Sequence, residues 1–152
     1  DIERDILPMS KALDMAVAAW DVLDSGGLTG KYNTPQNGEP KRMSKASTKT
    51  LAIADELIRM GKEIGRSPAQ IAINWVRQQP GRVIPIIGAR SEAQIKDNLA
   101  CLEFELTGEQ LQKLNETTKI EMGFPQSFLA SDHVHNLIFG ETYSLVDNHR
   151  SL

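Results

Sequence analysis

Two short stretches combine glycine with a basic side chain in a way that suits an anionic ligand. The first is Gly88-Ala-Arg90, followed by Ser91 at an expected helix start. Free backbone N–H groups, the positive end of the helix dipole and a guanidinium would converge there, which is the donor set a phosphate monoester requires. An ordinary turn with a capped helix and a solvated arginine is the alternative, because capping boxes are common.

The second stretch is Gly26-Gly-Leu-Thr-Gly-Lys31-Tyr32. Its glycines let the backbone come close to a pyrophosphate, and the lysine supplies a positive charge. It is not a Walker P-loop, because Tyr32 stands where that motif needs serine or threonine. Trp20, a few residues earlier, either offers a flat ring to a planar cofactor or is a core residue.

Both stretches follow segments that we predict to be strands. Met15–Trp20 is a short apolar run that predicts a strand buried on both faces, with a continuation of the preceding helix as the alternative. Val83–Ile87 is β-branched except for Pro85, whose missing N–H must fall at a bulge or an unpaired position. The carboxyl ends of parallel strands are where α/β folds bind ligands, so both stretches stand at candidate sites.

The remaining pattern is helical. Apolar spacing predicts a helix before Asp14 that is kinked or starts late at Pro8, and another helix that ends at Gly65. Further helices are expected from three serine or threonine caps, each followed by glutamine at the third position: Ser67-Pro-Ala-Gln70, Ser91-Glu-Ala-Gln94 and Thr107-Gly-Glu-Gln110. Residues 21–47 read as a long loop, and residues 123–152 as an irregular tail.

Strands alternating with helices predict a parallel α/β architecture. Buried parallel strands need a neighbouring strand on both sides, and two strands cannot provide this for each other. The sheet is therefore expected either to be part of a larger sheet or to leave its edges unpaired. The composition fits a globular domain: 152 residues, 17 basic and 20 acidic, with a net charge of −3. This balance argues against a general nucleic-acid binder. The lone Cys101 fits a reducing, cytoplasmic compartment, and neither a membrane-spanning run nor a signal peptide is expected.

Taken together, three stretches resemble the aldo-keto reductase superfamily. They are Trp20–Tyr32, the helix Ser67-Pro-Ala-Gln-Ile-Ala-Ile-Asn-Trp75, and Ile84-Pro-Ile-Ile-Gly-Ala-Arg90 with Gln94, Asp97 and Asn98. The tail, with Gly123-Phe-Pro-Gln-Ser-Phe128 and Leu145-Val-Asp-Asn-His149, looks most like the aryl-alcohol dehydrogenase-like branch. The resemblance implies that residues 1–122 form the C-terminal half of a (β/α)8 barrel and that residues 123–152 form its tail.

The resemblance also implies NADP(H) as the cofactor, bound at the carboxyl ends of the strands. Trp20 would stack on the nicotinamide and Lys31 would approach the pyrophosphate. Gly88 and Arg90 would hold the 2′-phosphate end. The other implied contacts are Asp21, Leu23 and Ser25 along the turn after Trp20, Gln94 beside the 2′-phosphate, and Asp97 with Asn98 at the adenine edge.

Two positions depart from the family pattern. The family often has Trp-Ser-Pro-Leu where this chain has Trp20-Asp-Val-Leu23, so Asp21 would weaken pyrophosphate binding unless its side chain turns away. Asp97 replaces the commoner glutamate and is one methylene shorter.

The family's catalytic aspartate, tyrosine, lysine and histidine come from the other half of the barrel, so no catalytic residue is expected here. Tyr32 and Tyr143 do not match the catalytic motif, and His133-Val-His135 lacks a third ligand for a metal.

Three hypotheses follow from this. The chain is part of a reductase of aldehydes or aryl alcohols and inactive alone, or it is a non-catalytic NADPH-binding or regulatory protein like the potassium-channel β-subunits. The third is a truncated, inactive product. An isolated half is expected to form an oligomer or to pair with a complementing half-barrel, without nucleic-acid or membrane partners.

Overall fold

The computed structural model describes residues 2–33 and 45–147. Internal contacts group the chain into two compact units. The sheet unit is Ala16–Thr118, and the terminal unit combines Asp1–Met15 with Lys119–Leu152. The boundary between residues 122 and 123 suggested by the sequence concerns the family barrel and stays a prediction.

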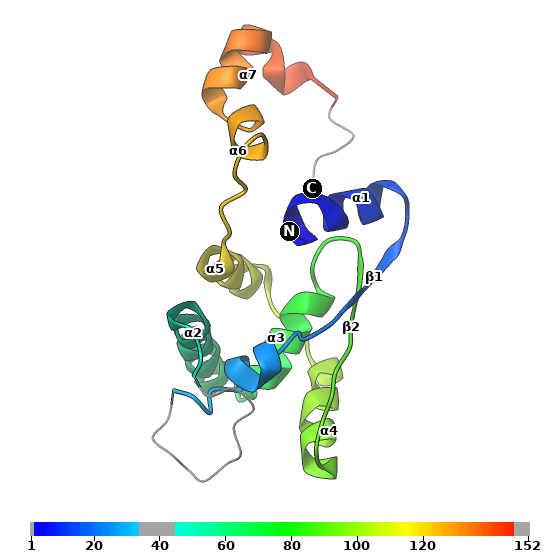
Figure 1. Cartoon of the computed structure of the whole chain (residues 1–152), viewed down its shortest axis with the longest axis vertical. Coiled ribbons are helices and arrows are strands. Elements are labelled where there is room, and N and C mark those ends of the chain that lie inside the picture. The colour runs from blue at the N-terminus through cyan, green and yellow to red at the C-terminus, as the bar shows by residue number, and fades with distance from the viewer. Residues whose placement is uncertain (1, 34–44, 148–152) are drawn as a thin grey trace. The chain divides into compact units, whose positions relative to one another are not determined.

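The sheet unit contains two parallel strands, β1 (Ala16–Ala19) and β2 (Arg82–Pro85), which lie side by side in Figure 1. Their register pairs Ala16 with Arg82 and Ala19 with Pro85. Pro85 ends its strand, and the next residue, Ile86, donates its N–H to the Ala19 carbonyl at 2.8 Å. The missing N–H of the proline therefore falls at the end of β2. The parallel architecture and the first strand are confirmed, and the helical alternative for residues 15–20 is wrong.

The prediction that β1 is buried on both faces is wrong. In both strands exposed and half-buried residues alternate, so Val17 and Val83 are half-buried whereas Ala18 and Ile84 are exposed. A strand is buried on both faces only where a layer covers each of them. No element in the described part of the sheet unit covers the face that carries Ile84, which is 58% exposed.

Helices supply most of the sheet unit. They are α2 (Thr48–Ile64), α3 (Pro68–Arg77), α4 (Glu92–Leu99) and α5 (Gly108–Thr118), with 3₁₀ turns at Asp24–Thr29 and Ala100–Glu103. The predicted start of α3 is confirmed: Ser67 Oγ accepts the Gln70 N–H at 3.2 Å, and the Gln70 side chain accepts the Ser67 N–H at 3.4 Å. The predicted stop of α2 is also confirmed, since Gly65 has a left-handed φ of 68°.

The core of the sheet unit lies between helices α2, α3 and α5. It is formed by a cluster of buried side chains, Leu57, Met60, Ile71, Ala72, Leu106 and Leu114. Half-buried Leu23 and Leu28 pack against this cluster from the turn that follows β1. Burial of those two leucines attaches the turn to the helices, because apolar area removed from water stabilises the contact.

The terminal unit is helical. A π-helix (Ile2–Ile6) leads into α1 (Leu7–Ala12), whose first turn contains Pro8. The α-helix thus starts at the proline, as one of the two alternatives for this segment predicted, but a π-helical turn precedes it. The segment from Gly123, predicted to be irregular, instead contains α6 (Gln126–Leu129), α7 (Asp132–Phe139) and a 3₁₀ turn (Gly140–Leu145). Ser131 caps α7 by accepting the Val134 N–H at 3.4 Å. Across the described residues, no helix is both long and apolar enough to span a bilayer.

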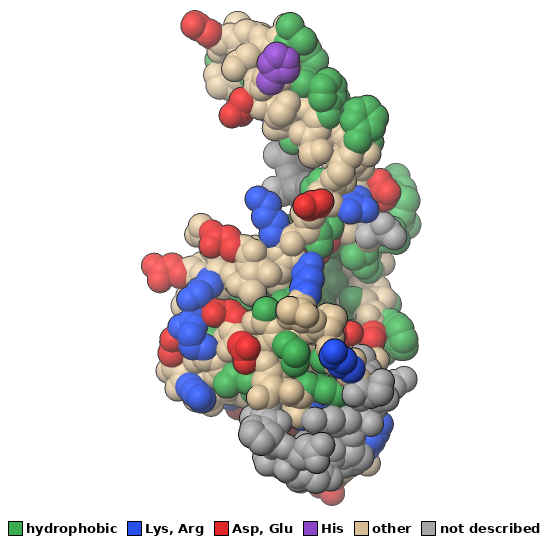
Figure 2. Space-filling model, turned by 60° about the vertical axis from the view of Figure 1, so that its left-hand side comes forward, with side chains coloured by type: hydrophobic (Ala, Val, Ile, Leu, Met, Phe, Trp, Pro, Cys, Tyr) green, Lys and Arg blue, Asp and Glu red, His purple; other side chains and the backbone are tan. Residues whose placement is uncertain are grey.

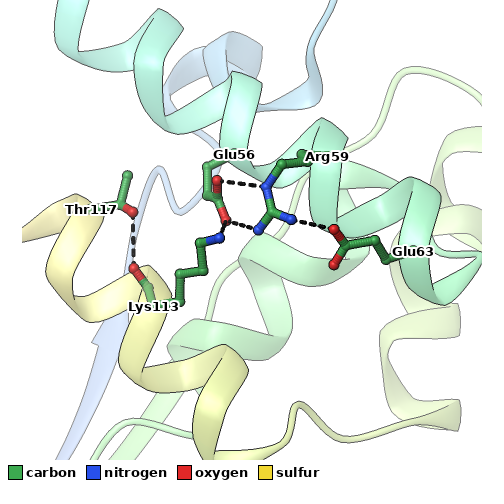
Figure 3. A network of polar contacts seen from close by, with 5 residues as sticks. All are labelled: Glu56, Arg59, Glu63, Lys113 and Thr117. Atoms are coloured by element: carbon green, nitrogen blue, oxygen red, sulfur yellow. Dashed lines mark hydrogen bonds and ion pairs between the residues drawn. The ribbon is translucent and has the colours of Figure 1, made fainter.

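Acidic and basic side chains are interspersed on the face of the protein shown in Figure 2. Within the sheet unit, Glu56 joins two helices through such side chains (Figure 3). It accepts hydrogen bonds from Arg59 of α2, at 3.0 Å from Nε, and lies 3.4 Å from Lys113 Nζ of α5. Arg59 also pairs with Glu63. The hydrogen bond from Arg59, with its charge and Lys113, lowers the pKa of Glu56 below its ordinary 4.5, although burial opposes this.

Because the folded pKa is lowered, the stabilisation by Glu56 is present above pH 4.5 and lost as the pH falls through the folded value. We expect Glu56→Gln to lower the free energy of unfolding at pH 7 and to flatten its fall between neutral and acid pH. Urea unfolding at several pH values measures this. Glu105→Gln removes an exposed acid and is the control. A Glu56→Gln profile parallel to that of the unaltered chain would contradict the account.

Candidate functional site

The register of β1 and β2 brings the two predicted anion-binding turns to the same edge of the sheet. Trp20 follows β1 directly, and Ile86 to Gly88 follow β2. Trp20 is 74% exposed, so its interpretation as a core residue is wrong. An exposed indole at a strand's carboxyl end is placed where a planar ligand can stack on it.

The turn after Trp20 is tightly folded by its own polar groups. Asp21 has a φ of 56°, and its Oδ1 accepts the Ser25 N–H at 2.6 Å. The Ser25 hydroxyl donates to the other carboxylate oxygen at 3.1 Å. The Asp21 carboxylate is therefore hydrogen-bonded to Ser25 within the turn. This arrangement is consistent with the expectation that the Asp21 side chain turns away if a pyrophosphate binds here. Leu23 contributes its side chain to the core contact rather than to the edge of the sheet.

Lys31 lies across this turn. A Cβ built on Gly26 would stand 2.9 Å from Lys31 Nζ, so glycine at position 26 makes room for the ammonium. Gly26 also has a φ of 88°, which other residues rarely adopt. Among the described residues, Lys31 has no carboxylate partner, and its Nζ lies 5.6 Å from the centre of the Tyr32 ring. Its charge is thus available to an anion.

The second turn presents an arginine at a helix start. Gln94 Oε1 accepts the Arg90 N–H at 2.8 Å, and Ser91 Oγ accepts the Gln94 N–H at 3.3 Å. This confirms the Ser91 cap, although the Gln94 side chain reaches Arg90 rather than Ser91. Arg90 is exposed, and its guanidinium has no partner in the part of the chain that the structure describes.

Space and donors around Arg90 fit a phosphate group. A Cβ built on Gly88 would meet nothing within 4 Å, so the turn is open there. Asn98, which is buried, donates from its Nδ2 to the Gly88 carbonyl oxygen at 3.5 Å and so links the turn to α4. The first N–H groups of α4 have no intrahelical acceptor. Arg90, Gly88, Gln94 and Asn98 thus form one cluster.

The Asp97 carboxylate makes its hydrogen bonds to residues outside that cluster. Its Oδ2 accepts the Ser67 hydroxyl at 2.9 Å, and its Oδ1 accepts the Gln70 Nε2 at 2.6 Å. Both donors belong to the start of α3. The implied contact of Asp97 with adenine stays a prediction.

Sequence reasoning missed the residues that tie the first turn to α2. Asp24 accepts the Thr50 hydroxyl at 2.7 Å, and Asn33 Nδ2 donates to the Leu51 carbonyl at 2.8 Å. The signals were Ser47-x-x-Thr50, a helix-start pattern, and the Asp24-Ser-Gly-Gly run, which favours left-handed backbone. Asp24 and Ser25 indeed have φ values of 49° and 51°.

A small apolar cavity of about 70 Å³ lies beneath the same turn. It is lined by Val22 and Leu28 of the turn and by side chains of α2, α3 and α5, among them Trp75 and Leu114. The space is less than half of the ~150 Å³ that holds benzene in an engineered protein cavity. It marks loose packing between the turn and the helices.

Side chains for a metal site are not assembled in the described residues. No group of three histidine, cysteine or carboxylate side chains with metal-binding geometry occurs there. His135 stacks on Tyr143, with ring centres 3.7 Å apart. Burial raises the pKa of the Cys101 thiol, which keeps it protonated and unreactive at neutral pH.

Comparison with known proteins places this geometry in a family context. The sequence profile of the Aldo/keto reductase family matches residues 1–119. A probable aryl-alcohol dehydrogenase of Saccharomyces cerevisiae is 35% identical over 140 residues, covering 87% of this chain and 43% of that protein. The aryl-alcohol dehydrogenase [NADP(+)] of Phanerodontia chrysosporium is 31% identical, over 91% of this chain and 38% of that one.

The structural comparison agrees. The glycerol dehydrogenase of Gluconobacter oxydans matches with a TM-score of 0.62 and 30% identity, covering 81% of this chain and 42% of that one. This chain therefore spans less than half the length of these relatives. The resemblances seen in the sequence, to the reductase family and to its aryl-alcohol dehydrogenases, are confirmed.

The Asp24–Thr50 hydrogen bond yields a test of how the first turn is held. Asp24→Ala should lower the free energy of unfolding by about 1 kcal/mol, the scale of one hydrogen bond, and should speed amide exchange at residues 24–29. In a Thr50→Val background the same substitution should have a smaller effect, because the bond is already absent. Equal effects in both backgrounds would show that the bond does not hold the turn.

Proposed function

Since the chain belongs to the Aldo/keto reductase family, we propose that it supplies the cofactor-phosphate part of an NADP(H)-dependent oxidoreductase of aldehydes or aryl alcohols. The observation that carries this proposal is Arg90, an exposed guanidinium without a partner among the described residues, at the start of α4 and beside the open Gly88 turn. A guanidinium and a helix N-terminus together favour a phosphate dianion.

Within the proposed site, each turn has its own task. NADP(H), when bound, supplies the hydride chemistry, and the protein supplies binding and orientation. Arg90 and the first turn of α4 would hold the 2′-phosphate, which NADP(H) has and NAD(H) lacks. Lys31 would face the pyrophosphate. Trp20, exposed at the neighbouring strand end, would stack on the nicotinamide ring and fix its orientation.

The proposed site lacks a proton donor for a carbonyl. Tyr143 stacks on His135 in the terminal unit, and Tyr32 follows Lys31 in the first turn; neither stands in a motif for such a donor. Hydride transfer to a carbonyl needs a proton at the oxygen, so we propose that this chain alone does not turn over.

A partner would complete the barrel. Ile84 is 58% exposed and Ile86 50%, and both outer edges of the two-stranded sheet are unpaired in the described residues. Unpaired edges and exposed apolar residues favour association. We propose that a complementing half-barrel or a second copy covers them.

The 2′-phosphate assignment predicts a loss of cofactor discrimination. The unaltered chain should bind NADPH at least tenfold more tightly than NADH, and Arg90→Ala should lower the NADPH affinity about tenfold or more, the scale of a hydrogen bond to a charged group. Isothermal titration measures both affinities. Lys96→Ala removes an equal charge from an exposed position of α4, paired with Glu92, and is the matched control. An Arg90→Ala variant that keeps the preference for NADPH would refute the assignment.

The missing proton donor predicts that the purified 152-residue chain does not reduce an aryl aldehyde with NADPH. Loss of NADPH absorbance with a benzaldehyde substrate measures this, with a complete aryl-alcohol dehydrogenase as the positive control. Turnover above the uncatalysed rate would contradict the proposed inactivity while leaving the cofactor site untouched.

A further inference from the structure

The carboxylate of Asp97, in the last turn of α4, joins this helix to the start of α3. It is half-buried on α4, and it accepts one hydrogen bond from Ser67 and one from Gln70. These donors lie 30 and 27 residues away in the chain, at the first turn of α3. We propose that Asp97 is a positioning residue rather than a contact to adenine: it holds α4 against α3, and the helix in turn sets the position of Arg90 and Gly88, which precede it.

Helix α4 depends on polar contacts because its apolar attachment is weak. Leu99 is 48% exposed, and Leu102, just beyond the helix, is 62% exposed. The one buried residue of α4 is Asn98, which is polar. With so little apolar area removed from water, hydrogen bonds to neighbouring elements determine how the helix is oriented.

The contacts run continuously from α3 to the phosphate turn. Asp97 holds α4 to Gln70, and the next residue, Asn98, reaches the Gly88 carbonyl. Gln94, one helical turn before Asp97, accepts the Arg90 N–H. Residues three apart share a helix face, so Gln94 and Asp97 are linked through one turn of rigid backbone.

Each carboxylate oxygen of Asp97 accepts a hydrogen bond from its own donor at the start of α3, Ser67 Oγ or Gln70 Nε2. Gln70 uses Oε1 to accept the Ser67 N–H and Nε2 to reach Asp97, so its amide orientation is fixed from both sides. The position is also favourable for a negative charge, because it is the N-terminus of α3. A glutamate would carry the carboxylate one methylene beyond the position at which Ser67 and Gln70 donate to it.

The role rests on the proposed function, since it concerns the site that would bind the 2′-phosphate. It differs from the adenine contact that the family pattern implies for this position. If Asp97 contacted adenine, its loss would weaken only ligands with the adenine amino group. If it positions Arg90, its loss weakens every ligand with the 2′-phosphate, whatever the base.

The test therefore compares 2′,5′-ADP with its hypoxanthine counterpart, 2′,5′-IDP, which carries the same phosphates. Asp97→Asn should weaken both by about tenfold, the scale of a lost hydrogen bond to a charged group, with equal factors. NMR titration of the full chain measures affinities in this weak range. Glu103→Gln is the matched control: it removes an acid that pairs with Arg66 at 2.9 Å and that has no hydrogen bond to α4 among the described residues.

Exchanging the amide and the carboxylate between positions 70 and 97 distinguishes a positioning role of Asp97 from a general loss of folded structure. Gln70→Glu alone would set two carboxylates against each other and weaken both ligands. In the double variant Gln70→Glu with Asp97→Asn, the asparagine amide donates to the new carboxylate, and the glutamate still closes the capping box. Affinity for both ligands should return to within about twofold of the unaltered chain, while Asp97→Glu should weaken both.

Three results would overturn the role: a loss confined to 2′,5′-ADP, no loss for either ligand, or no recovery in the double variant. Failure of the unaltered chain to bind either ligand would refute the proposed cofactor site instead. The positioning role would then be judged by amide exchange at residues 90–95, which Asp97→Asn must accelerate and the double variant must restore.

Discussion

The parallel pairing of β1 with β2 is the constraint on which the rest of the site depends. Two turns separated by more than fifty residues can serve one ligand only if their strands end side by side, and the pairing of Ala19 with Pro85 achieves this. The hydrogen bond from Ile86 to Ala19 extends the pairing just past the strand ends. The exposed indole of Trp20 directly follows β1, and the guanidinium of Arg90 follows β2 by a few residues, so both lie near that edge.

The two turns are held in different ways. The first turn attaches to the helices through the burial of Leu23 and Leu28, and its polar groups satisfy one another. The second turn belongs to a helix with little buried apolar surface, and it is held by hydrogen bonds through Asn98 and Asp97. Hydrogen bonds are more directional than apolar contacts, which suits a site that must present a guanidinium and backbone N–H groups to one phosphate.

Local signals were predictable from the sequence, and contacts between distant residues were not. The starts of three helices followed from serine or threonine with glutamine three residues later, because that pattern satisfies helix N–H groups locally. The exposure of Ile84 and the partners of Asp97 depend on which elements lie nearby, and no spacing reveals that. The helical tail was missed because its segments are short: α6 has four residues and α7 has eight.

The central claim is that both strand-end turns contact one NADPH molecule. Titration of the isotope-labelled chain with NADPH, followed amide by amide, tests it most directly. We expect saturable shifts with a common dissociation constant at residues 20–31 and at residues 88–94. Shifts in only one of these segments, or in the two segments with different dissociation constants, would contradict a single site built across the paired strands.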